Sequence, residues 1–165
     1  MQVYLLRHGI SEEGRAGLSD ADRALTAEGR RKLRQILQRA AQADVKPDLI
    51  LSSPLKRALQ TAEIAKEVFS YKDEILRTKA LLPGASPEQV WDEIRVHKAE
   101  ASLVLVGHNP LFDTLAGYLL GQPELQMDFK KGAILRLDLE SFSGHPKGIL
   151  RWYLTSKLAA NHGQG

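Results

Sequence analysis

Cysteine is absent from this 165-residue chain, and so are long apolar runs. Without cysteine there are no disulfides, no thiolate metal ligands and no cysteine nucleophile, which excludes cysteine-based catalysis. No apolar stretch approaches the ~20 residues that cross a bilayer, so we expect no membrane association. The segment Met1–His8 lacks the basic leader and small-residue cleavage site of a signal peptide. We therefore expect a cytoplasmic protein.

A large excess of charge of one sign is also missing, because the net charge is only +3. The one basic cluster comprises Arg30, Arg31, Lys32, Arg34 and Arg39. We interpret it as the solvated face of an amphipathic helix rather than a surface for an acidic partner. No aromatic residues alternate with it, so the sequence gives no indication of nucleic-acid binding. The length predicts one domain over residues 1–165, with a substantial buried core.

Short apolar runs alternate with helical patterns through most of the chain. The predicted strands are Val3–Leu6, Leu49–Leu51, Glu74–Arg77, Leu103–Val106, Ala133–Leu139 and Ile149–Leu154. The continuous apolar character of the strands favours burial on both faces. The sequence therefore predicts an α/β fold in which helices cover both faces of a mainly parallel sheet. The last two strands are expected to pair as a hairpin.

Cap signals place the starts of the helices. One helix is expected to begin near Thr26, and Ser53-Pro54 and Asn109-Pro110 each read as a cap followed by a first turn. Ser86 and Gln89 have the form of a capping box. Gly121 is expected to stop the helix that follows Asn109-Pro110. The aperiodic residues 9–23 are expected to form a loop.

Polar side chains capable of chemistry follow the ends of three predicted strands. Arg7 and His8 follow the first strand, Arg57 lies just beyond the second, and His108 follows the strand over Leu103–Val106. Each residue alone has an ordinary explanation, as a turn or surface residue. In an open α/β sheet, however, ligands bind beyond the carboxyl ends of the strands. The joint arrangement therefore predicts one site.

This set of side chains suits a phosphoryl group. Arginine offers several planar hydrogen bonds to phosphate oxygens, and helix N-termini add N–H donors. A neutral His8 could attack phosphorus while Arg7, Arg57 and His108 stabilise the charge of the transition state. The other histidines are His97, His145 and His162. No other residues suited to this chemistry are predicted beside them, so we interpret them as structural or solvent-exposed.

The motifs around these residues resemble those of the histidine phosphatase superfamily, which includes the phosphoglycerate mutases. Residues 6–9, Leu-Arg-His-Gly, are similar to its signature Arg-His-Gly, and residues 52–62, Ser-Ser-Pro-Leu-Lys-Arg-Ala-Leu-Gln-Thr-Ala, are similar to its second motif. Residues 106–110, Val-Gly-His-Asn-Pro, are similar to the third, and the turn Leu25-Thr26 to Gly29 also fits. The motifs occur in the expected order.

The resemblance implies a three-layer α/β/α, phosphoglycerate mutase-like fold. It implies that His8 becomes phosphorylated and that Arg7, Arg57 and His108 bind the phosphate. It implies neither a metal nor another cofactor.

One departure from the larger family bears on the substrate. Many phosphomonoesterase members carry a glutamate acid shortly after the third strand, whereas Leu76–Pro87 contains no carboxylate. An alkoxide leaving group normally needs such an acid, but the imidazole of phosphohistidine can be protonated near neutral pH. The sequence therefore favours a SixA-like phosphohistidine phosphatase acting on a phosphorylated protein, such as a histidine phosphotransfer domain. Carboxylates that could still supply a proton are Glu12, Glu13, Glu88 and Asp92.

Two alternatives stay open at this stage. The first is a small-molecule phosphomonoesterase of the same fold. The second is a phosphate-binding or protein-interaction module without catalysis. The sequence names neither the physiological substrate nor the oligomeric state.

Overall fold

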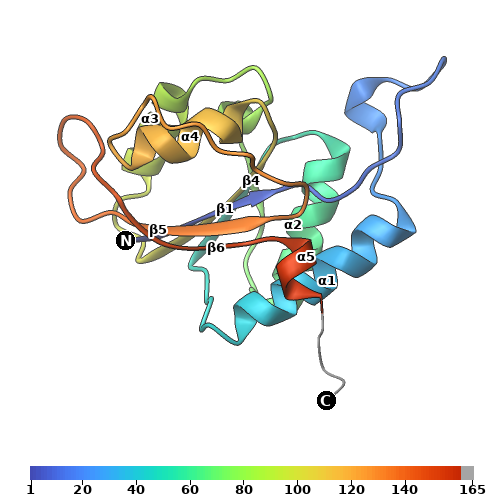
Figure 1. The fold of residues 1–165 in the computed structure, drawn as a ribbon, viewed down its shortest axis with the longest axis horizontal. Helices are drawn as coiled ribbons and strands as arrows, with labels where there is room; N and C mark the ends of the chain where they lie inside the picture. Colours follow the sequence, from blue (N-terminus) through green and yellow to red (C-terminus); the bar gives the residue numbers. More distant parts are fainter. Residues whose placement is uncertain (161–165) are drawn as a thin grey trace.

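The computed structural model describes residues 1–160 of the chain (Figure 1). The strands are β1 (Gln2–Arg7), β2 (Leu49–Ser52), β3 (Leu76–Arg77), β4 (Ser102–Gly107), β5 (Ile134–Asp138) and β6 (Ile149–Leu154). The helices are α1 (Ala27–Ala41), α2 (Lys56–Val68), α3 (Pro87–Val96), α4 (Leu111–Leu119) and α5 (Ser156–Ala159), with 3₁₀ turns η1 (Asp20–Asp22) and η2 (Lys79–Leu81). The short helix α5 and the turn η1, inside the expected loop, were not predicted.

The strands form one six-stranded sheet in the order β3-β2-β4-β1-β5-β6. The pairs β1–β4, β2–β4 and β2–β3 are parallel, whereas β1–β5 and β5–β6 are antiparallel. The predicted mainly parallel sheet and its C-terminal hairpin are thus confirmed. Because β4 lies between β1 and β2, the carboxyl ends of these three strands are neighbours at one edge of the sheet.

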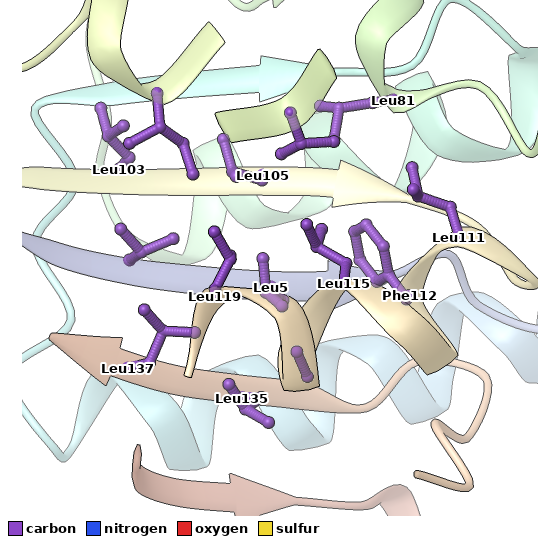
Figure 2. Close-up of a cluster of buried hydrophobic side chains, with 14 of the residues drawn as sticks. Leu5, Leu81, Leu103, Leu105, Leu111, Phe112, Leu115, Leu119, Leu135 and Leu137 are labelled. Carbon is purple, nitrogen blue, oxygen red and sulfur yellow. The ribbon is translucent and has the colours of Figure 1, made fainter. Parts of the chain in front are cut away.

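Helices cover both faces of the sheet, as the uninterrupted apolar strands require. Helices α3 and α4 lie on one face, and α1, α2 and α5 on the other (Figure 1). Alternate residues of β2, β4, β1 and β5 enter the two cores, so Leu5 of β1 belongs to one and Leu6 to the other. Figure 2 shows the first core, where leucines of β1, β4 and β5 meet α4 side chains such as Phe112. The α/β/α fold is therefore confirmed.

The predicted caps are confirmed at two helices. The Thr26 hydroxyl accepts a hydrogen bond from Gly29 N and caps α1, while Ser86 and Gln89 form the expected capping box of α3. Helix α4 ends at Leu119, just before Gly121, whose φ of +74° explains why glycine stands there.

The two other predicted caps are wrong. Helix α2 is capped by Leu55 and not by Ser53, because the Ser53 N–H still pairs with Val106 O at 2.9 Å and keeps that residue in sheet geometry. Helix α4 is capped by Pro110 and not by Asn109, whose side-chain amide instead donates to the Asp113 carboxylate. In both cases the predicted capping group is engaged elsewhere.

Within residues 1–160, no helix has the length and apolarity needed to span a membrane.

Candidate active site

The backbone brings the ends of β1, β4 and β2 into register. Arg7 is paired with Gly107, and His8 N donates to Gly107 O at 3.0 Å, so the pairing continues past the end of β1. Ser53 N in turn pairs with the carbonyl of Val106. His8, His108 and Ser53 therefore follow adjacent strands at the same edge of the sheet, as the sequence predicted.

His8 is held in a defined tautomer. Its side chain is buried, and Nδ1 lies 2.7 Å from Gly9 O, which can only accept a hydrogen bond. Nδ1 therefore carries the ring hydrogen, and Nε2 keeps its lone pair. Burial, opposed by the Gly9 hydrogen bond and assisted by the positive charges of Arg57 and Arg7, lowers the His8 pKa to about 4. The ring is thus neutral at neutral pH.

His108 packs beside His8, with the ring centroids 5.1 Å apart. Burial first, and then the neighbouring His8 and Arg57, lower its pKa to about 3. Its Nε2 lies 2.7 Å from the Ser53 hydroxyl, which accepts from Leu55 N and so has its own hydrogen available for the ring. When that hydroxyl donates to Nε2, the ring hydrogen of His108 lies on Nδ1, a buried atom with no hydrogen-bond partner.

Each of the two arginines is anchored through its terminal nitrogens. Arg7 donates from NH1 to Phe129 O at 2.7 Å. Arg57 donates from NH1 to Asp20 O at 2.8 Å and from NH2 to the Asp20 carboxylate at 3.2 Å. In both side chains Nε is buried and without a partner. The Nε–H group of each guanidinium therefore remains free to bind an anion.

Three unpartnered nitrogens of side chains close to His8 can consequently serve as N–H donors: Arg7 Nε, Arg57 Nε and His108 Nδ1. Buried donors without partners are rare, because each one forfeits a hydrogen bond that it could make with water. Donors gathered around a neutral imidazole match the requirements of a tetrahedral oxyanion such as a phosphoryl group.

Residues of the second motif tie this region together. The Thr61 hydroxyl accepts from Gly9 N and donates to Arg57 O, so it links the segment after His8 to helix α2. The Gln60 side chain accepts from Leu25 N and secures the entry to α1. Gln60 and Thr61 both belong to the second motif, but the sequence alone predicted no role for either of them. Their place in that motif was the available signal.

Asp20 is the site contact that sequence reasoning missed. It lies in η1, and its carboxylate accepts from both Arg57 and Arg23. Its side chain is 63% exposed whereas that of Arg57 is 6% exposed, which places the carboxylate on the solvent side of the guanidinium. Hydrogen bonding from Arg23, together with the charge and hydrogen bond of Arg57, outweighs the opposing effect of burial and lowers the Asp20 pKa, so the group is ionised.

The four carboxylates left open by the sequence have other partners or are exposed. Glu12 accepts from Ala24 N, and Asp92 forms an ion pair with Arg95 on the outer side of α3. Glu13 and Glu88 are exposed. No hydrogen bond or ion pair joins any of these four, all within the described residues, to His8, His108, Arg7 or Arg57.

The remaining histidines stand apart from this region. His97 follows α3 and lies 3.3 Å from the Glu93 carboxylate, and His145 is exposed in the β5–β6 connection. His162 lies outside the described residues. Within residues 1–160, no group of three or more His, Asp or Glu side chains is arranged to hold a metal ion.

Comparison with known proteins places this geometry in context. A family model described as histidine phosphatase superfamily (branch 1) matches residues 3–81. An uncharacterised protein of Picosynechococcus sp. (strain ATCC 27264 / PCC 7002 / PR-6) is 33% identical over 139 residues, covering 83% of this chain and 84% of the relative.

Solved structures share the fold over nearly the whole chain. A structure of the protein histidine phosphatase SixA complexed with tungstate matches with a TM-score of 0.84 and 25% identity, covering 95% of this chain and 98% of that one. A mycobacterial glucosyl-3-phosphoglycerate phosphatase matches with a TM-score of 0.70 at 18% identity, over 91% of this chain and 96% of that one. At that identity the second likeness shows the fold alone.

Proposed function

This chain belongs to the histidine phosphatase superfamily, branch 1, and on that premise we propose that it is a phosphohistidine phosphatase that uses His8 as its nucleophile. The observation that carries the proposal is the set of three unpartnered N–H donors around a neutral imidazole whose Nδ1 is already engaged. The substrate is a phosphorylated protein in the cytoplasm.

In the first step the lone pair of His8 Nε2 attacks phosphorus. A P–N bond forms to His8, and the bond to the leaving group breaks, with its electron pair passing to the leaving atom. His8 becomes a cationic phosphoimidazolium, and the Gly9 carbonyl accepts from its Nδ1–H throughout. Arg7, Arg57 and His108 donate to the equatorial oxygens, where a preorganised donor is worth about 3 kcal/mol of barrier.

In the second step water attacks the same phosphorus. The P–N bond to His8 breaks, His8 regains a neutral ring, and the water protons pass to the phosphate and to solvent. The lowered pKa of His8, about 4, keeps the free ring neutral and ready for another cycle. No step requires a metal ion or a cofactor.

Phosphohistidine is favoured over phosphate esters by the leaving group. An alkoxide needs a proton from a positioned acid, and the segment Leu76–Pro87, which begins with β3, supplies no carboxylate. A protonated phosphohistidine ring departs as neutral imidazole and needs no such donor. The likeness to the protein histidine phosphatase SixA, at 25% identity, supports the same substrate class.

The test is to trap the intermediate and remove the nucleophile. Brief reaction of the purified protein with a phosphohistidine-bearing protein should label His8 with acid-labile phosphate, and His8→Ala should lose both the label and all turnover. The kcat/KM for the phosphohistidine protein should exceed that for sugar phosphates. The reverse preference would assign the protein to small-molecule phosphomonoesterases, and tight phosphate binding without turnover of any substrate would make it a binding module.

A further inference from the structure

The carboxylate of Asp20 forms an ion pair with Arg57, one of the two arginines proposed to bind phosphate. Asp20 Oδ2 lies 3.2 Å from Arg57 NH2, on the solvent side of a guanidinium whose Nε is buried and without a partner. A phosphoryl group approaches the buried donors from solvent, so the part of the substrate beyond phosphorus has to pass close to Asp20. The charge of Asp20 also acts on His108, whose pKa it raises against the larger lowering effects.

The position of Asp20 is fixed by contacts on both sides. Arg23 donates to its other carboxylate oxygen at 3.0 Å, and Arg23 is itself held by Glu12 O at 2.6 Å and by the Ser11 hydroxyl at 3.1 Å. These hydrogen bonds fix the loop that carries Asp20 to residues Ser11 and Glu12. A preorganised charge acts more strongly on a bound substrate than one that must be ordered first.

We propose that Asp20 is a specificity-determining residue, whose negative charge favours substrates with a cationic imidazole leaving group and disfavours substrates with an anionic one. The inference rests on the proposed function, because it names the leaving group of that same reaction. Asp20 is not itself a proton donor in this scheme, since the low pKa imposed chiefly by Arg23 keeps it ionised.

The electron balance explains how a fixed charge at this place selects phosphohistidine. A phosphohistidine ring protonated on its second nitrogen is a cation, and a nearby carboxylate stabilises that form. As the P–N bond breaks, the bonding pair returns to the ring, which leaves as neutral imidazole with its proton in place. His8 Nε2 donates the pair for the new P–N bond. The positive charge thus moves from the substrate ring to His8, and no proton is transferred.

For an anionic leaving group the same charge is repulsive. Phosphoglycerate carries a carboxylate beyond its phosphoryl group, and two like charges a few ångströms apart at a half-solvated site cost about a factor of ten in binding. The negative charge of Asp20 partly offsets the positive charges of Arg7 and Arg57 on the solvent side of the site. The wild-type residue therefore narrows the range of accepted substrates.

The variant Asp20→Asn isolates the charge. Its backbone carbonyl and amide oxygen can still accept from Arg57, as Asp20 O and Oδ2 do now. Steady-state kinetics on a phosphohistidine peptide and on phosphoglycerate, with inhibition by inorganic phosphate, form the readout. Asp20→Asn should lower kcat for the peptide roughly tenfold, and should lower KM for phosphoglycerate and Ki for phosphate by roughly three- to tenfold.

Two further variants make the result specific. Asp22→Asn is the matched control, because Asp22 lies in the same turn and accepts from Ser19 without contacting Arg57, and it should leave both substrates unchanged. Asp20→Glu keeps the charge and should restore the wild-type preference.

A loss of equal size on both substrates would show that Asp20 only holds Arg57 in place and would overturn the inference, as would no change at all. Failure of the proposed function has a different signature, since the wild type itself would then prefer phosphoglycerate to the peptide.

Discussion

At the scale of single residues, Gly29 sets how closely α1 approaches the segment that follows His8. A Cβ at Gly29 would lie 2.2 Å from the carbonyl oxygen of Ile10, which is backbone and cannot turn aside. At Gly9, a Cβ would meet Leu33 Cδ1 at 2.6 Å. Both glycines therefore stand where the segment that follows His8 packs in close contact with α1.

Gly29→Ala tests this close approach. Alanine has the higher helix propensity, by about 1 kcal/mol, so propensity alone predicts stabilisation. The steric conflict with Ile10 is larger, and we expect a net loss of about 2 kcal/mol in the free energy of unfolding, measured by urea denaturation. Activity should fall as well, because the displaced segment carries Gly9, whose carbonyl holds His8.

Gly14→Ala provides the control, because nothing lies within 4 Å of a Cβ built there. It should change the free energy of unfolding by no more than ~0.5 kcal/mol. If both variants behaved alike, steric contact at Gly29 would not be the reason for that glycine.

At the scale of secondary-structure elements, Arg7 depends on the connection between α4 and β5. The Asp113 carboxylate on α4 accepts from Phe129 N at 3.2 Å and from the Asn109 amide at 2.8 Å. The carbonyl of the same Phe129 accepts from Arg7. One carboxylate on the helix thereby fixes the backbone carbonyl that orients the Arg7 guanidinium.

Asp113→Ala should therefore weaken phosphate binding without touching the pocket. We expect KM for a phosphohistidine substrate to rise roughly tenfold while kcat changes less, because Arg7 loses its fixed orientation. Glu124→Ala, in the same connection and exposed, should have no effect on KM. Equal KM values for the two variants would exclude this role of Asp113.

The same elements show what sequence reasoning can reach. The convergence of Arg7, His8 and His108 could be predicted because strand ends carry their register into space, and Arg57 followed from the neighbouring strand and its motif. Asp20 could not be predicted, since it lies in a loop with no periodicity to fix its position. The support of Arg7 was equally hidden, because a carbonyl such as that of Phe129 occurs at every residue.

The cap assignments failed for a related physical reason. A serine before proline is a strong cap signal, but the signal does not reveal whether the hydroxyl has another partner. Ser53 lies at the site, where its hydroxyl pairs with His108, and the helix begins beyond it. At Thr26 and Ser86, where no buried partner competes, the same signal was correct.

At the scale of the whole molecule, the two buried histidines couple the site to stability. The folded protein holds the pKa of His8 at about 4 and that of His108 at about 3, whereas an unfolded chain has the ordinary histidine pKa of ~6.5. Between those values the unfolded chain binds more protons than the folded one. Stability therefore rises with pH over this window and is lost as the pH falls below about 6.5.

The size of this effect follows from the shift and can be measured. For His8 alone, lowering the pH from 7.5 to 5 should remove about 2 kcal/mol from the free energy of unfolding. Glutamine does not titrate, so His8→Gln should remove the contribution of His8 to the pH dependence of the free energy of unfolding. Urea denaturation of His8→Gln should therefore show a flatter pH profile than that of the wild type. His145→Gln, at an exposed position, should keep the wild-type slope. Parallel profiles for His8→Gln and the wild type would mean that His8 titrates normally in the fold, and the neutral nucleophile would then no longer follow from its burial.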